Sequence, residues 1–127
     1  MNVVGVGIDL VEVERFRRSL ERTPTMIERM FTEVERAYAL AASDPAERFA
    51  VRFAAKEAVM KAMGVALGAF GFHDVEVQRE EGGRPLLGVY GPALLLAEER
   101  SIVHWEISLT HTATSAGAVV VALSAGG

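Results

Sequence analysis

Two carboxylate residues stand at positions where packing alone would not require them. Asp9 ends the apolar run Gly5-Val6-Gly7-Ile8-Asp9, and Glu57 interrupts an otherwise apolar, Ala-rich segment. Both are hard oxygen ligands, and proteins usually hold Mg²⁺ with two carboxylates supplemented by substrate phosphate oxygens and water. The pair therefore indicates a Mg²⁺ site that acts on a phosphate-containing substrate.

Cationic residues accompany these carboxylates, and they are Arg52, Lys56, Lys61 and His111. His111 also lies beside the hydroxyl residues Ser108, Thr110 and Thr112, which could form an oxyanion pocket at the end of a strand. Mg²⁺ ligands combined with several cations are typical of chemistry at a pyrophosphate. The chain lacks both the G-x-x-x-x-G-K-[ST] and the G-x-G-x-x-G pattern, which excludes P-loop and Rossmann phosphate sites.

Each candidate also has a simpler structural explanation. Asp9 could be the N-cap of a following helix. Glu57 and Lys61 have the i, i+4 spacing of a surface ion pair, which contributes roughly 0.3 kcal/mol. His111, at a strand end, could serve only as a structural hydrogen-bonding group.

Hydrophobic periodicity predicts the elements that must position these residues. In the first strand the apolar Val4, Val6 and Ile8 alternate with a second face that ends in Asp9. The predicted strands are about 3–9, 75–77, 86–90, 104–110 and 117–123, and the predicted helices are about 10–21, 32–40, 45–63 and 92–100. We expect residues 65–72 to form a loop. The mixture predicts an α+β fold with one long helix packed on a small antiparallel sheet.

Composition limits the class of protein further. The 127 residues fit a single domain, 1–127, and the net charge of −4 argues against nucleic-acid binding. No apolar run is long enough to span a membrane. The first residues include no basic region of the kind that begins a secretory signal, so we do not expect one here. The absence of cysteine suits a reducing cytoplasm, where we expect the protein to act.

Three sequence blocks resemble motifs of the short bacterial type of phosphopantetheinyl transferase. They are Gly5–Glu12, Arg52–Ala62 with its W/F-x-x-K-E-x-x-x-K-A pattern, and Ser108–His111 with its S-[IL]-[TS]-H pattern. Their order and spacing also match, as does Gly83-Arg84-Pro85 before a strand. One departure is Gly64-Val65-Ala66, where the family often has Gly-Thr-Gly.

The resemblance implies transfer of 4′-phosphopantetheine from coenzyme A to a serine of apo-acyl carrier protein, with release of adenosine 3′,5′-bisphosphate. It also implies a homotrimer whose active sites lie between subunits, and Mg²⁺ held by Asp9 and Glu57. The residues implied to contact coenzyme A are Arg52, Lys56, Lys61, His111 and Thr112. Arg52 and His111 would lie near the phosphates of the nucleotide, and Lys61 at the pyrophosphate.

The catalytic roles implied for these residues follow from the reaction. Glu57, or a water that it orients on Mg²⁺, is the expected base for the carrier serine. Lys61 is expected to stabilise negative charge at the pyrophosphate. Whether Lys61 also protonates the leaving group or acts only as a fixed cation stays open.

An arginine stripe follows the predicted metal ligand Asp9. Arg15, Arg18 and Arg22 lie at i, i+3 and i+7, within about 60° on one helix face. The stripe could be a solvated face with local acidic partners. Because the family docks acidic acyl carrier proteins with arginines on this helix, the resemblance favours a carrier-docking surface.

Two other classes of function compete with the transferase. One is a non-catalytic module that keeps the fold and binds only a nucleotide or a carrier. The other is a structural trimer with surface ion pairs. Loss of Asp9, Glu57 or Lys61 would favour the non-catalytic module, and all three are present.

Overall fold

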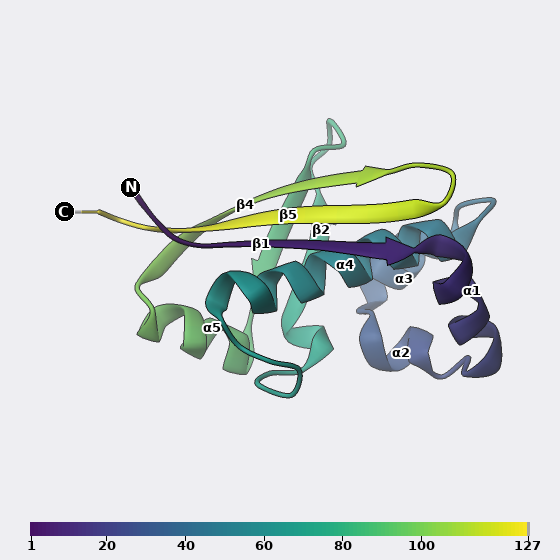
Figure 1. The fold of residues 1–127 in the computed structure, drawn as a ribbon, viewed down its shortest axis with the longest axis horizontal. Helices are drawn as coiled ribbons and strands as arrows, with labels where there is room; N and C mark the ends of the chain where they lie inside the picture. Colours follow the sequence, from purple (N-terminus) through teal and green to yellow (C-terminus); the bar gives the residue numbers. More distant parts are fainter. Residues whose placement is uncertain (127) are drawn as a thin grey trace.

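The computed structural model describes residues 1–126 and has an α+β architecture in which helices cover one face of an antiparallel sheet (Figure 1). The strands are β1 (Asn2–Glu12), β2 (Val75–Arg79), β3 (Pro85–Val89), β4 (Ile102–His111) and β5 (Ser115–Ser124). The helices are α1 (Val13–Arg22), α2 (Met26–Met30), α3 (Glu33–Leu40), α4 (Pro45–Met63) and α5 (Gly91–Glu99), with a 3₁₀ turn at Phe72–Asp74. The predicted fold class is confirmed. Gly127, the last residue of the predicted domain, lies outside the described residues.

The main sheet joins segments from opposite ends of the sequence. Its strand order is β1-β5-β4, with antiparallel neighbours, while β2 and β3 form a separate two-stranded hairpin. Pairing between β1 and β5 runs from Asn2 opposite Ser124 to Glu12 opposite Ser115. The strand that carries Asp9 is therefore held along its length by β5.

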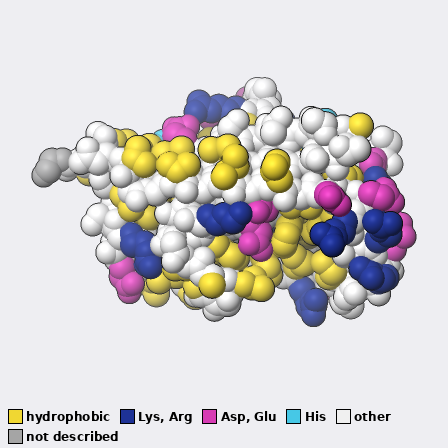
Figure 2. Space-filling view, viewed as in Figure 1, with side chains coloured by type: hydrophobic (Ala, Val, Ile, Leu, Met, Phe, Trp, Pro, Cys, Tyr) yellow, Lys and Arg dark blue, Asp and Glu magenta, His cyan; other side chains and the backbone are white. Residues whose placement is uncertain are grey.

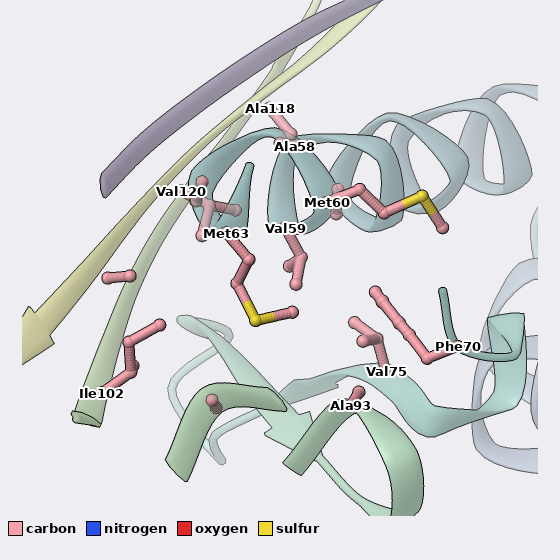
Figure 3. Close-up of a cluster of buried hydrophobic side chains, with 14 of the residues drawn as sticks. Ala58, Val59, Met60, Met63, Phe70, Val75, Ala93, Ile102, Ala118 and Val120 are labelled. Atoms are coloured by element: carbon pink, nitrogen blue, oxygen red, sulfur yellow. The ribbon is translucent and has the colours of Figure 1, made fainter. Parts of the chain in front are cut away.

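Helix α4 begins and ends where the sequence predicts. Pro45 occupies the first turn, and Gly64 ends the helix with φ of 69°, a left-handed conformation that glycine adopts readily. Small residues of α4 pack against β5, as the contact of Ala58 with Ala118 shows (Figure 3). Because these side chains are short, the helix lies close to the sheet.

Two glycines let β1 touch the backbone of α4 directly. A Cβ atom added to Gly5 would lie 1.8 Å from the carbonyl oxygen of Ala62, and one added to Gly7 would lie 1.8 Å from that of Ala58. No side chain could occupy either position without displacing main chain. The same strand face continues to Asp9, which is thereby directed toward α4.

The start of α1 differs from the prediction. Residues 10–12 continue β1 because they pair with Ser115–Gly117, so the helix begins at Val13 and not at Leu10. The N-cap residue of α1 is Glu12, which excludes the explanation of Asp9 as a helix cap. Helix α2 was not predicted, whereas the predicted helix at about 32–40 is confirmed as α3, which begins with a capping box of Thr32 and Glu35.

The outward face of β1 is apolar and exposed. Val6, Ile8 and Leu10 are 58%, 60% and 72% exposed. Figure 2 shows a row of hydrophobic side chains over the sheet. Within the described part of the chain, no helix combines the length and the apolar character needed to cross a bilayer.

Candidate active site

Lys61 and Asp9 meet where β1 lies on α4. The Lys61 Nζ atom lies 2.9 Å from Asp9 Oδ1 and donates a hydrogen bond of 3.0 Å to the carbonyl oxygen of Ile8. The Asp9 side chain is 17% exposed and that of Lys61 is 53% exposed. Lys61 therefore pairs with β1. It does not form the local ion pair with Glu57 on the helix surface that the i, i+4 spacing also allowed.

Glu57 joins this pair from one helical turn earlier. Partial burial raises the pKa of the Glu57 carboxyl, the negative charge of Asp9 raises it further, and Lys61 opposes both effects. Two carboxylates in a partly desolvated site repel each other, and a cation bound by both would relieve that repulsion. Asp9 and Glu57 therefore fit a divalent cation.

The number of carboxylates is also informative about the metal. Among residues 1–126 no group of three or more histidine or acidic side chains is arranged as a complete metal site. A pair of carboxylates suits Mg²⁺, which keeps water ligands and accepts phosphate oxygens from substrate. The donor set thus fits a metal that is completed by a phosphate-containing ligand.

A cavity lies beside this cluster. It has a volume of about 770 Å³ and includes Asp9, Arg15 and Glu57 in its lining, together with the rings of Phe16 and Phe53, which are tilted at 34° to each other with centroids 5.2 Å apart. Figure 2 shows a hollow with hydrophobic side chains bordered by charged groups. We call it the carboxylate cleft, and its size and mixed lining suit an extended ligand with an anionic end.

Arg52 and His111 line a second cavity, of about 310 Å³, which we call the guanidinium pocket. Arg52 is 2% exposed, and its Nη1 donates to the carbonyl oxygen of Arg48 at 3.2 Å. Its Nε and Nη2 are buried without a hydrogen-bond partner in the described structure, and burial lowers the pKa of the guanidinium. Because buried cations are normally paired, this pocket suits an anionic group.

The predicted partners Arg52 and His111 are therefore brought together, whereas two further arginines of the pocket were missed. These are Arg48 and Arg79. Arg48 precedes Arg52 by four residues, a spacing that could have revealed it. Arg79 ends β2, and nothing in its local sequence indicates the pocket.

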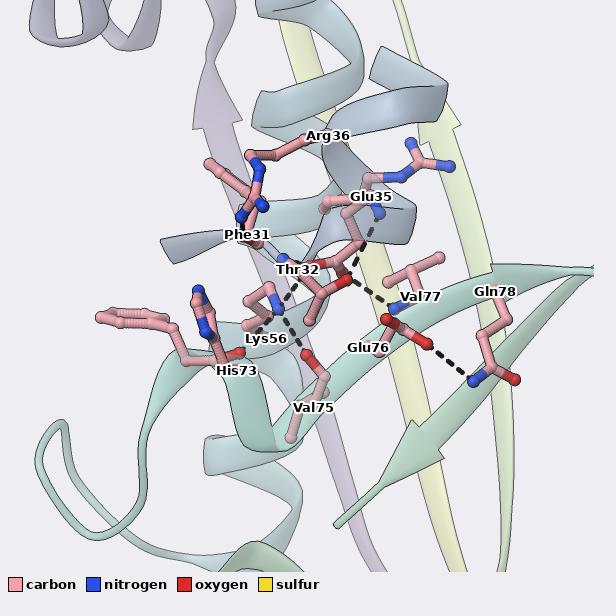
Figure 4. A network of polar contacts seen from close by, with 12 residues as sticks. Phe31, Thr32, Glu35, Arg36, Lys56, His73, Val75, Glu76, Val77 and Gln78 are labelled. Carbon is pink, nitrogen blue, oxygen red and sulfur yellow. Dashed lines mark hydrogen bonds and ion pairs between the residues drawn. The ribbon is translucent and has the colours of Figure 1, made fainter. Parts of the chain in front are cut away.

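Lys56 is not in either cavity. Its ammonium is 2.8 Å from Glu35 Oε1 and donates to the carbonyl oxygens of Phe72, at 2.7 Å, and Val75 (Figure 4). These partners use all three of its N–H groups, and the side chain is 1% exposed. The structure thus places Lys56 in the interior, with a structural role in place of the predicted contact with coenzyme.

Glu35 completes this interior network and was not among the predicted site residues. Its Oε1 also accepts from the Thr32 N–H at 2.9 Å, and its Oε2 accepts from the Val77 N–H at 2.8 Å. The charge of Glu35 partly offsets the burial that lowers the pKa of Lys56. The Glu35–Lys56 pair thus ties α3, α4 and β2 together.

We expect Lys56→Met to destabilise the protein by about 3–5 kcal/mol, because Glu35 would remain as an unpaired buried carboxylate. Urea denaturation measures this loss. Lys61→Met is the matched control and should change stability by less than about 1 kcal/mol, since its ion pair is partly exposed. A Lys56→Met protein of unchanged stability but raised KM for coenzyme A would instead restore Lys56 as a coenzyme ligand.

Thr112 and the arginine stripe lie near the cavities. The Thr112 hydroxyl accepts a hydrogen bond from the Ser115 N–H at 3.0 Å, so it stabilises the turn between β4 and β5. Arg15 lines the carboxylate cleft, and Arg18 and Arg22 line an adjacent surface cavity. Figure 2 shows Lys and Arg side chains gathered at the end of the molecule where α1 lies.

Comparisons of sequence and structure with known proteins identify the family. The chain belongs to the 4′-phosphopantetheinyl transferase superfamily, whose family model matches residues 5–123. Holo-[acyl-carrier-protein] synthases of Salinispora arenicola and Moorella thermoacetica are 47% and 44% identical to it, over 94% and 91% of this chain and 98% and 90% of theirs. A Bacillus anthracis holo-(acyl-carrier-protein) synthase solved in complex with CoA (3′,5′-ADP) is also similar, with a TM-score of 0.81, 33% identity and coverage of 97% of this chain and 98% of that one.

Proposed function

We propose that this protein transfers 4′-phosphopantetheine from coenzyme A to a serine of apo-acyl carrier protein and releases adenosine 3′,5′-bisphosphate. The observation that carries the proposal is the cluster of Asp9, Glu57 and Lys61 at the edge of the carboxylate cleft. Similarity to holo-acyl-carrier-protein synthases over nearly the whole chain supports the choice of substrates. A cytoplasmic location is part of the proposal.

Asp9 and Glu57 would hold Mg²⁺ at the pyrophosphate of coenzyme A. The bound metal would supply neutralisation of phosphate charge and polarisation of the phosphorus–oxygen bond. Glu57 accepts the serine proton, directly or through a water that it orients, as the serine oxygen bonds to the β-phosphorus. The bond from that phosphorus to the 5′-phosphate oxygen of the nucleotide breaks, and Lys61 stabilises the departing oxygen by donating a hydrogen bond or a proton.

The remaining phosphate of the nucleotide would enter the guanidinium pocket. This pocket and the carboxylate cleft share no lining residue, although both include residues of α4. Residues 52 and 57 lie five positions apart on the helix, so their side chains leave it in different directions. We therefore propose that the cleft of one subunit meets the guanidinium pocket of a neighbour, in a homotrimer.

The exposed apolar face of β1 supports this assembly. Apolar side chains exposed side by side along a strand are typical of a surface covered by another subunit. Cyclic symmetry would give each of three subunits the same contact and close the assembly. In that arrangement no single chain contains a whole site.

A mixed-subunit experiment tests the shared site. We expect Glu57→Gln chains and Arg52→Met chains to be inactive when expressed separately. When the two chains are co-expressed, we expect about a quarter of parental activity. Random mixing would place an intact Glu57 opposite a neighbour's intact Arg52 at one interface in four. Light scattering should report three chains. No recovery in co-expressed chains would place the complete site within one subunit.

The proposed reaction itself has a direct test. Purified protein mixed with coenzyme A, apo-acyl carrier protein and Mg²⁺ should release adenosine 3′,5′-bisphosphate and increase the mass of the carrier by one phosphopantetheine group. Chelation of divalent metal should stop both products, and added Mg²⁺ should restore them. Binding of coenzyme A without either product would favour the non-catalytic module.

A further inference from the structure

Tyr38 of α3 holds three arginines in the guanidinium pocket. The guanidinium carbons of Arg48, Arg52 and Arg79 lie 4.0, 4.4 and 5.0 Å from the centre of its ring. The carbonyl oxygen of Tyr38 also accepts a hydrogen bond of 2.7 Å from Arg48 Nη1. One residue thus organises cations from α4 and from the end of β2.

Three guanidinium groups so close together repel one another, and the ring offsets part of that repulsion. The face of an aromatic ring carries negative charge that attracts a cation within about 6 Å. The nearest acidic group that lines the pocket, Glu47, lies 3.4 Å from His111 Nδ1. The buried Nε and Nη2 atoms of Arg52 are left without partners, so the pocket still lacks an anion.

The interior ion pair holds the helix that carries Tyr38. Tyr38 follows Glu35 by three residues on α3, so the two side chains lie on neighbouring parts of the helix surface. Glu35 is fixed by Lys56 of α4 and by the main chain of β2, the same two elements that supply the arginines. Helix α3, and with it the backbone of Tyr38, is therefore held against the elements that supply the arginines before a ligand arrives, which lowers the ordering cost of binding.

We propose that Tyr38 is a positioning residue that gathers Arg48, Arg52 and Arg79 to bind a phosphate monoester dianion. This inference rests on the proposed function, under which that group is the 3′-phosphate of coenzyme A. A terminal phosphate carries about two negative charges and three acceptor oxygens, which matches several guanidinium groups. A pyrophosphate within a chain offers fewer charges on each phosphorus. Arg48 and Arg79 thereby become determinants of specificity for the 3′-phosphorylated coenzyme.

Steady-state kinetics with coenzyme A and with 3′-dephospho-coenzyme A test the proposal. Tyr38→Leu should raise KM for coenzyme A about tenfold, change kcat less than about twofold, and leave KM for the dephospho donor unchanged. Tyr38→Phe keeps the ring and should behave as the parent. Calorimetry with adenosine 3′,5′-bisphosphate and with AMP should show the same selective loss for Tyr38→Leu without any need for transfer.

A second variant protects the test against a folding defect in Tyr38→Leu. Arg79→Gln removes an exposed arginine of the pocket and should also weaken the binding of adenosine 3′,5′-bisphosphate without changing the binding of AMP. Arg29→Gln on α2 makes the same change in charge and should leave the binding of both nucleotides unchanged. Equal losses with both donors, or no loss, would overturn the positioning role of Tyr38. A parental protein that uses neither donor would overturn the proposed function and this inference with it.

Discussion

Glu57→Gln and Asp9→Asn are each expected to lower kcat for phosphopantetheine transfer by about a thousandfold. Each substitution removes a proposed charged metal ligand while keeping the size of the side chain, so the fold should persist. Glu57→Gln also removes the proposed base for the serine proton. Release of adenosine 3′,5′-bisphosphate measures the rate, and thermal unfolding verifies the fold.

The concentration of Mg²⁺ separates the two roles of these carboxylates. If Asp9 acts only as a ligand, excess Mg²⁺ should partly restore Asp9→Asn by mass action. The same excess should not restore Glu57→Gln, because no amide can accept the serine proton. Glu33→Gln, at the exposed start of α3, is the matched control and should keep parental activity. An Asp9→Asn protein with parental rate and early unfolding would show that Asp9 is structural.

Charge reversal at Arg15 is expected to raise KM for acyl carrier protein roughly thirtyfold while leaving KM for coenzyme A nearly unchanged. Arg15 is exposed and lines the carboxylate cleft, so an acidic carrier bound along α1 would bring its serine toward Glu57. A reversed charge replaces an attraction by a repulsion at that position. Because such contacts are screened by salt, Arg15→Glu should also flatten the salt dependence of KM for the carrier.

Other arginines make the carrier experiment more specific. Arg18→Glu and Arg22→Glu should raise the same KM by smaller factors, since these residues line the adjacent surface cavity and not the cleft itself. Arg17 is excluded from the docking surface because it is bonded to Asp44 and Glu14. Arg84→Glu, in the β2–β3 hairpin, is the charge-reversal control. Unchanged carrier kinetics of Arg15→Glu at low salt would show that the stripe is only solvated surface.

Elements defined by local signals could be predicted from the sequence. Pro45 and Gly64 limit α4, and the Thr32–Glu35 capping box begins α3, because each signal acts within a few residues. The start of α1 was mispredicted for the opposite reason. Whether Leu10 belongs to a strand or a helix is decided by its pairing with Gly117, which no local pattern reveals.

The site was predictable to the extent that its residues lie within recognisable blocks. Asp9, Glu57 and Lys61 belong to such blocks, and the structure brings them together. The sequence grouped Arg52 with Lys56 as cations for a phosphate ligand, but it could not distinguish an unpaired cation in a pocket from one saturated by Glu35. That difference, like the part played by Tyr38, depends on contacts between segments far apart in the chain.

The pairing of β1 with β5 constrains when activity can appear during synthesis. The ribosome makes Asp9 early, but its register partner, Ala118, leaves the ribosome only after every other described helix and strand has been made. Until then β1 has no neighbour to satisfy its backbone or to hold its glycines against α4, and its apolar side chains remain open to chaperones or to other nascent chains. Asp9 and Glu57, the proposed Mg²⁺ ligands, can therefore be brought together only after translation of β5, and a ribosome stalled before Ser115 would carry a nascent chain in which the proposed metal site has not formed.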